Sequence, residues 1–263
     1  MTDEIHDQPA TTASPARRHP AWSWRIGVFA LGGALLALLI AGLMLTLARF
    51  DVIDKLTGFG WYVKSNYIGL ASALIGLIAV IWAAIRKTPG RLAGIVALVI
   101  GLGMAGVFYA AVMGPAQANP NMHDVTTDVD DPPQFVTLPL REDNLKQFDG
   151  DIEAWRAMHR EGYPDIQPII VNEAPAQVLA RARALAEQKG WDIAAYDPAT
   201  GHMEATAYAG YLRFRDDVIV EATPIADGST RVDMRSVSRV GGSDLGYNAA
   251  RIREFLIDLK NGG

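Results

Sequence analysis

The sequence contains no cysteine among its 263 residues. Disulfide bonds, thiolate nucleophiles and cysteine-ligated metal sites are therefore excluded. It also has no long run of Lys or Arg, and its formal net charge is -5 at pH 7. Attraction to nucleic acid phosphates needs a basic surface, so we expect no nucleic-acid partner.

Charged side chains are also missing from three long apolar runs, at residues 26–48, 67–85 and 92–113. A helix needs about 20 apolar residues to cross a bilayer, so each run predicts a transmembrane helix. The preceding residues are rich in Pro, Thr, Ser and Ala without apolar periodicity, which predicts a disordered cytoplasmic tail. The expected organisation is a tail (1–24), a three-helix membrane unit (25–114), a loop-rich lead-in with a short helix (115–165) and a soluble domain (166–260).

Basic residues near the ends of the runs indicate the orientation, because cytoplasmic flanks carry the excess of Lys and Arg. Those before the first run and between the second and third are Arg17, Arg18, Arg25, Arg86, Lys87 and Arg91. Residues 114–140 contain no Lys or Arg and five acidic or His side chains near their middle. The basic residues between the first two runs weaken this contrast, but two Asp accompany them. We therefore expect an inner (cell) membrane protein with a cytoplasmic N-terminus and a periplasmic domain.

The apolar runs lack the ionisable side chains that transport pathways require, which favours a membrane anchor. Small residues recur at four-residue spacing in each run and allow helices to approach closely. They are Gly33, Ala37 and Ala41, then Gly69 and Ala73 with Ser72 and Gly76, then Ala97, Gly101 and Ala105. We favour packing of the three helices on one another; the alternative is self-association or docking on a membrane partner.

Residues 119–134 are rich in Asp, Pro and Thr and predict a loop. Asp128, Asp130 and Asp131 do not make a calcium loop, because Gly and Glu are missing from its sixth and twelfth positions. The histidines of the domain, His123, His159 and His202, follow no metal-ligand spacing, so we expect them in loops or on the surface and predict no metal site.

The soluble domain shows a mixed pattern of elements. A short helix at 151–160 precedes a strand at 169–171, a helix from Pro175 to Gly190, four strands and a final helix that Ser243 or Asp244 opens. The strands are expected near 192–196, 202–209, 217–223 and 231–240. This order predicts an α+β fold, an antiparallel sheet with helices on one face. TATA-box-binding-protein-like and helix-grip folds share the order, as architecture alone.

Alternate side chains of a strand point to opposite faces of its sheet. In the last strand Val232, Met234, Ser236 and Ser238 share one face, and Arg231, Asp233, Arg235 and Arg239 share the other. Val218, Val220 and Ala222 match the first set in the strand before, and Asp217 and Glu221 match the second. We interpret the charged face as a solvated surface with weak, opposite-sign cross-strand pairs; the alternative is a binding face.

Four segments carry a family resemblance: GHMEATA at residues 201–207, DDVIV at 216–220, RVDMRSVSRVG at 231–241 and SDLG at 243–246. They resemble the domain of unknown function 1499 family, over about residues 123–259. The resemblance implies no activity, because the family is uncharacterised; it implies an envelope or organelle-lumen domain, in some members behind membrane spans. Glu221 stands where the family more often has Arg, which argues against an anion site on that strand.

No motif identifies an enzyme. Ser236, Ser238 and Ser243 are the candidate nucleophiles, but no Gly-x-Ser-x-Gly elbow is present, and Ser243 is better explained as a helix cap. The sequence therefore names no catalytic residue and no cofactor, and it favours a protein that is not an enzyme.

Candidate contacts with a ligand or partner come from the charged and polar residues of the last two strands and the last helix. They are Asp217, Arg235, Arg239, Asp244, Asn248 and Arg251. The three Arg would together hold a carboxylate or phosphate. The interpretation we favour is internal pairing of Arg235 and Arg239 with Asp216, Asp217 or Asp233.

The expected function is a membrane-anchored domain that binds or scaffolds a cell-envelope component, either protein or lipid. The alternatives are a hydrolase or transferase acting on envelope lipid or glycan, and an accessory subunit of a membrane complex.

Overall fold

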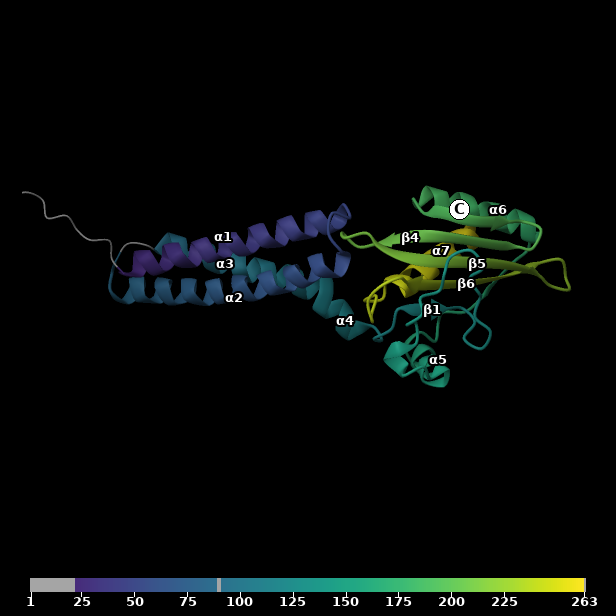
Figure 1. The fold of residues 1–263 in the computed structure, drawn as a ribbon, viewed down its shortest axis with the longest axis horizontal. Helices are drawn as coiled ribbons and strands as arrows, with labels where there is room; N and C mark the ends of the chain where they lie inside the picture. The colour runs from purple at the N-terminus through teal and green to yellow at the C-terminus, as the bar shows by residue number, and fades with distance from the viewer. Residues whose placement is uncertain (1–21, 89–90, 263) are drawn as a thin grey trace, which may run out of the picture.

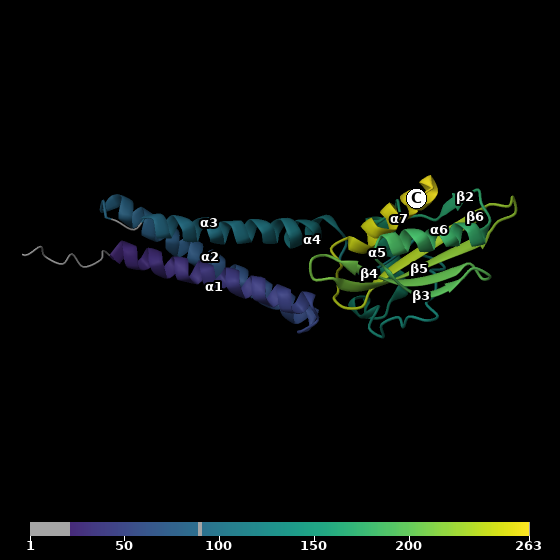
Figure 2. The same cartoon turned by 90° about the horizontal axis from the view of Figure 1, so that it is seen from above.

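The computed structural model describes residues 22–88 and 91–262. Most of the predicted tail, with Arg17 and Arg18, lies outside the described residues. The described chain consists of a long helical bundle followed by an α+β domain at one end of it (Figures 1 and 2).

Three helices of the bundle are long and apolar enough to cross a membrane. They are α1 (Trp22–Arg49), α2 (Lys55–Ile85) and α3 (Arg91–Phe108), and α3 continues through the π-helical turn η1 (Tyr109–Met113) into α4 (Gly114–Ala118). The helix α2 begins well before the apolar run at residue 67. Asp54 starts it there by accepting a hydrogen bond from the Thr57 N–H, and Gly58 then packs closely against Ala48 of α1.

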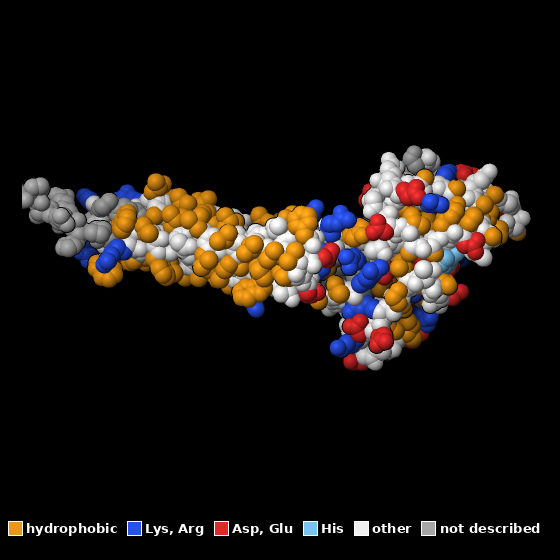
Figure 3. Space-filling view, turned by 45° about the horizontal axis from the view of Figure 1, so that its top comes forward, with side chains coloured by type: hydrophobic (Ala, Val, Ile, Leu, Met, Phe, Trp, Pro, Cys, Tyr) orange, Lys and Arg blue, Asp and Glu red, His pale blue; other side chains and the backbone are white. Residues whose placement is uncertain are grey.

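The small-residue stripes lie between the helices of this bundle. A Cβ atom placed on Gly76 would stand 2.6 Å from the carbonyl oxygen of Gly94, and one placed on Gly33 would stand 2.5 Å from Ser72 Oγ. The large apolar side chains face outward and form a continuous girdle (Figure 3). Close backbone approach therefore holds the bundle together, as the packing interpretation predicts.

The domain contains one antiparallel sheet with the order β1-β6-β5-β4-β3, and β2 also pairs with β6. Its strands are β1 (Asp124–Thr126), β2 (Ile169–Val171), β3 (Asp192–Asp197), β4 (His202–Ala209), β5 (Phe214–Pro224) and β6 (Thr230–Ser238). Its helices are α5 (Ile152–Gly162), α6 (Pro175–Gln188) and α7 (Tyr247–Asn261), with a short turn η2 (Lys146–Phe148). The predicted α+β class and the order of elements from β2 to α7 are confirmed.

The strand β1 corrects the prediction of an uninterrupted loop at residues 119–134. It pairs with β6, with Val125 opposite Ser236. Three residues are too few to show the alternation by which a strand is identified in a sequence. The lead-in thus belongs to the sheet.

The helices α6 and α7 cover the apolar face of the sheet. Val220 and Met234 lie opposite each other there and are fully buried. The lead-in adds Met122, Val125 and Trp155 to the same core. One core therefore draws on both sides of the boundary that the sequence places between residues 165 and 166.

Much of the charged face of the sheet is buried, so its interpretation as a solvated surface is wrong at Asp217, Asp233 and Arg235, whereas Arg239 at its edge stays exposed. Glu204 is 0% exposed and Arg235 is 5% exposed. The Glu204 carboxylate accepts hydrogen bonds from the N–H groups of Val136, Thr137 and Leu138, which belong to the lead-in. Burial by itself would raise the pKa of Glu204, but these donors outweigh it and hold the pKa below its usual value.

The cross-strand pairs on this face also differ from the prediction. Glu221 lies opposite Asp233, and Arg235 lies opposite Ile219. Burial, together with the facing carboxylate of Asp233, raises the pKa of Glu221 against the opposing effect of His202. Parity sorted the faces correctly, but it could not show which charges face one another.

Candidate functional site

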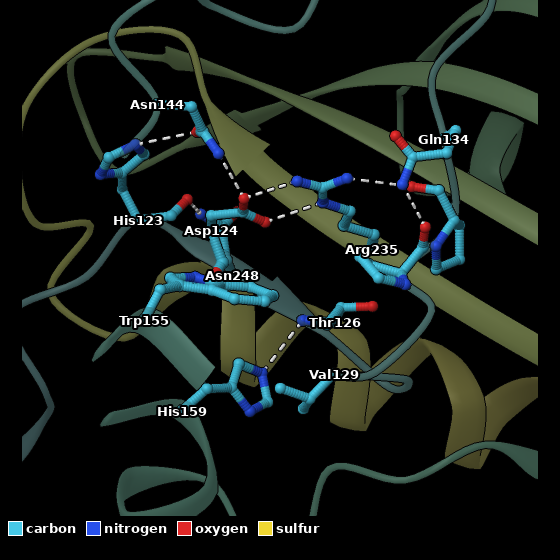
Figure 4. Close-up of polar contacts among 12 residues, drawn as sticks. His123, Asp124, Thr126, Val129, Gln134, Asn144, Trp155, His159, Arg235 and Asn248 are labelled. Atoms are coloured by element: carbon cyan, nitrogen blue, oxygen red, sulfur yellow. Dashed lines mark hydrogen bonds and ion pairs between the residues drawn. The ribbon is translucent and has the colours of Figure 1, made fainter. Parts of the chain in front are cut away.

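The six predicted site residues fall into three groups, and Arg235 belongs to a buried network (Figure 4). Its Nε and Nη2 atoms donate to the two carboxylate oxygens of Asp124 at 2.9 and 2.7 Å, and Nη1 donates to the Pro133 carbonyl at 3.1 Å. None of the predicted partners Asp216, Asp217 and Asp233 is used. Asp124 lies on β1, which the sequence analysis did not find.

Further side chains complete the network around Asp124. Asn144 donates to the carboxylate at 2.5 Å, and Trp155 Nε1 donates to the Asp124 carbonyl at 3.1 Å. His123 Nε2 lies 3.2 Å from Asn144 Oδ1, and His159 Nε2 accepts the Thr126 N–H at 3.1 Å. The network joins β1 to β6 and α5 and is closed to a ligand.

The histidine prediction is therefore wrong for His159, which is buried on α5. His123 lies in a loop before β1, as predicted, although its side chain is buried. His202 is half-buried, with its Nε2 atom 2.9 Å from Glu204 Oε1. Among residues 22–88 and 91–262, no group of three or more His, Cys, Asp or Glu is placed to hold a metal ion.

The second group, Asp244, Asn248 and Arg251, lies at the start of α7. Asp244 accepts the Asn248 N–H at 2.6 Å and the Gly246 N–H at 2.9 Å, so it caps this helix. Burial raises the pKa of Asp244, against the lowering effect of these two donors. Arg251 donates to Asp216 at 2.6 Å and to Ser236 Oγ at 2.8 Å. These side chains fasten α7 to the sheet.

The third group is the pair of Asp217 on β5 and Arg239 just after β6. Arg239 Nε donates to Asp217 Oδ2 at 2.9 Å, and Nη2 donates to Asp217 Oδ1 at 2.8 Å and to Thr206 Oγ1 at 2.9 Å. The hydrogen bond to Asp217 is the main cause of a raised pKa of Arg239. This is one of the internal pairs that we predicted. The three Arg of the candidate set are thus bound to three different carboxylates: Asp124, Asp216 and Asp217.

Contacts between the bundle and the domain lie beside this third group. Arg49 Nη1 donates to the Tyr211 carbonyl at 2.6 Å, and its guanidinium stacks 4.8 Å from the Tyr211 ring centroid. Arg215 Nη2 pairs with Asp51 Oδ2 at 3.2 Å. Lys55 pairs with the same carboxylate at 3.1 Å and donates to the Ala48 carbonyl at 2.7 Å. Sequence reasoning used Arg49, Asp51 and Lys55 only as orientation signals and missed this role.

A cleft of about 310 Å³ opens between the bundle and the domain. We call it the neck cleft. Residues 51–55 line it from the connection between α1 and α2, and Arg215, Arg239 and Val240 line it from the sheet. Basic side chains gather at this level in the space-filling view (Figure 3). The neck cleft therefore presents the guanidinium groups of Arg215 and Arg239, which suit an anionic group, with Asp51 and Asp54 beside them. The Lys55 ammonium is already taken up by the Ala48 and Arg49 carbonyls and by Asp51.

Comparison with known proteins gives one family. Residues 124–259 match the family described as "Protein of unknown function (DUF1499)", which is more than half of the chain. No curated protein matches the chain. The matched region begins at β1 and ends within α7, so it contains the whole sheet and all of the buried network except His123.

Proposed function

Since this chain belongs to the DUF1499 family of proteins of unknown function, we propose its function from its own residues: a membrane-anchored domain that binds a cell-envelope component outside the cytoplasmic membrane. The observation that carries the proposal is the neck cleft, which is built from both the membrane unit and the domain. A site of this composition lies where the helices leave the bilayer. It suits a component that is part of the membrane or lies on it.

The distribution of basic residues supports an extracytoplasmic domain. Arg25, Arg86, Lys87 and Arg91 gather at the end of the bundle remote from the domain. At the domain end, Asp51 and Asp54 offset two of the three basic residues, which are Arg49, Lys55 and Lys64. Cytoplasmic flanks carry the excess of Lys and Arg, so the remote end faces the cytoplasm of an inner membrane and the domain faces the periplasm.

The surroundings of the candidate nucleophiles favour binding over hydrolysis. Ser236 Oγ donates to Asn248 Oδ1 at 2.7 Å, and Ser238 Oγ accepts from Asn248 Nδ2 at 3.0 Å. Ser243 Oγ accepts the Leu245 N–H at 3.3 Å. Among the described residues, none of these hydroxyls is hydrogen-bonded to a histidine or carboxylate that would take its proton.

The absence of native cysteine allows a direct test with single-cysteine variants. We expect Ala226→Cys, in the exposed turn between β5 and β6, to react with a membrane-impermeant maleimide in spheroplasts. Ile85→Cys, at the exposed remote end of α2, should react only after lysis. Val240→Cys, in the neck cleft, should react slowly in membranes and faster after detergent extraction, because the bound component is then removed.

Two results would contradict the proposal. Labelling of Ile85→Cys in spheroplasts, with Ala226→Cys protected, would reverse the orientation. An unchanged rate at Val240→Cys after extraction, measured relative to Ala226→Cys, would show that nothing occupies the neck cleft in the membrane.

A further inference from the structure

We propose that the neck cleft binds the phosphate of a phospholipid headgroup from the leaflet on which the domain lies. This inference rests on the proposed function and gives the bound component a chemical class. Three observations support it: the depth of the neck cleft relative to the bilayer, guanidinium N–H groups that have no acceptor in the described chain, and neighbouring carboxylates that already accept hydrogen bonds from the protein.

The depth follows from helix length and from the residues at the two ends of the bundle. The 28 residues of α1 span about 42 Å, whereas the hydrocarbon core is about 30 Å thick. Lys64 lies over the Trp61 ring at 4.8 Å near the domain end, and Arg86 lies over the Trp82 ring at 5.7 Å at the remote end. Trp with a snorkelling cation marks each membrane–water interface. Trp61 therefore marks the interface on the domain side, and the connection between α1 and α2, about 10 Å farther along α2, lies at the outer edge of the headgroup layer.

Exposed apolar side chains on that connection support the same placement. Phe50 is 70% exposed and Val52 is 67% exposed, although both adjoin charged residues. Such side chains are stabilised when they reach the acyl boundary of a bilayer. A molecule held in the neck cleft beside them would have its polar group among the cations and its apolar part along the girdle.

Donors for a phosphate are available on both Arg residues. A guanidinium group has five N–H donors, and its fork matches phosphate oxygens. Arg215 makes one hydrogen bond among the described residues, from Nη2 to Asp51. Arg239 uses Nε and Nη2 for Asp217 and Thr206, and its Nη1 has no acceptor in the described part of the chain. Asp217 thereby fixes the orientation of a guanidinium that still has donors to offer.

The carboxylates of the neck cleft are already engaged. Asp51 lies between Lys55 and Arg215, and the hydrogen bond from Lys55 is the main cause of its lowered pKa. Asp54 accepts the Thr57 N–H at the start of α2. Asp51 is therefore compensated by two cations, with Arg213 adding positive charge, whereas Asp54 keeps its charge and is held by the N-terminus of α2.

The test is lipid binding to the full chain in detergent, followed by native mass spectrometry with phosphatidylglycerol, phosphatidylethanolamine and diacylglycerol. We expect both phospholipids to bind and diacylglycerol, which lacks the phosphate, to bind at least tenfold more weakly. Arg215→Gln should weaken phospholipid binding at least tenfold, which corresponds to about 1.4 kcal/mol, since it removes charge-assisted donors to the phosphate.

Arg183→Gln is the matched control. Arg183 lies on α6, pairs with Glu187, and has a side chain that is 47% exposed, as is that of Arg215. It should leave phospholipid binding unchanged, and neither variant should shift the melting temperature by more than a few degrees.

Equal binding of diacylglycerol and phospholipid, or an equal loss with both Arg variants, would overturn the proposal. If inorganic phosphate bound to the chain through Arg215 while neither phospholipid bound, the lipid proposal would be overturned in favour of a soluble anion. Because thiol labelling measures orientation and occupancy independently, failure of the lipid assignment is distinguishable from failure of the proposed function.

Discussion

Asp124 and Arg235 illustrate, at the scale of single residues, how one buried pair determines the position of a whole segment. The pair joins β1 to β6 across 111 positions of the sequence. Two buried charges compensate each other, so their net contribution to stability is small while both are present. Removing one of them leaves the other buried without a partner, which is costly.

We therefore expect Asp124→Asn to lower the free energy of unfolding by about 3–5 kcal/mol. Asp130→Asn is the control, because Asp130 pairs with Arg160 on the surface and both side chains are at least half exposed. Such a pair contributes about 0–1 kcal/mol. Denaturant unfolding of the purified chain measures both values. Similar small losses of unfolding free energy in the two variants would contradict the prediction that the buried pair is costly to break.

His159 gives a residue-scale prediction for pH. Burial lowers the pKa of His159 to about 4, against the raising effect of Asp124. In the unfolded chain the pKa is about 6.5, so between these two values the unfolded state binds more protons. Stability is then lost as the pH falls from about 6.5 to about 4, by up to about 3 kcal/mol from this group.

The non-titrating variant His159→Gln isolates this contribution. It is expected to be less stable at pH 7, because the bond to the Thr126 N–H is perturbed, and to lose less stability than the unaltered chain down to pH 4.5. Unfolding curves at successive pH values supply the comparison. Parallel pH profiles for the two proteins would show that His159 does not titrate on unfolding.

At the scale of elements, the bundle depends on backbone approach and the sheet on burial. Gly76 of α2 faces Gly94 of α3, whereas Gly103 of α3 has open space around it. Between the sheet and α7, by contrast, large side chains such as Met234 of β6 and Ile252 of α7 fill the space. A glycine is therefore required at Gly76, where the two helices touch, but not at Gly103, although both positions lie in equally apolar runs.

We expect Gly76→Val to destabilise the bundle by about 1–3 kcal/mol, the usual cost of overpacking. A Cβ at this position would stand 2.6 Å from the Gly94 carbonyl oxygen, so the helices must separate. Gly103→Val introduces the same side chain without a neighbour and should not destabilise. The melting temperatures of the two variants in detergent test this prediction. If both temperatures fall equally, the change in helix propensity, and not a clash between α2 and α3, is the cause.

At the scale of the whole molecule, the domain is held against its own helical bundle. Arg49 and Asp51 from the bundle contact Tyr211 and Arg215 from the domain. These contacts form the neck cleft from two parts of the chain that are far apart in sequence. The bundle therefore takes part in the candidate site, and removing it would remove half of the lining.

The sequence by itself determined the three membrane helices, the order of the α+β elements and the family. Apolar length, period-2 and period-3.6 patterns and the segments at 201–246 are local signals, and a local signal is complete within one element. The pairing of Asp217 with Arg239 was also predictable, because parity places both on one face of adjacent strands. Self-association of the bundle remains a prediction.

Only the tertiary structure decided the partner of Arg235, the burial of the charged face and the existence of the neck cleft. Each depends on residues separated by 66 or more positions, and the three-residue strand β1 has no pattern of its own. A charged side chain can pair with any opposite charge that folding brings near it. The choice is made by the packing of the lead-in over the sheet and of the domain against the bundle, which no local pattern encodes.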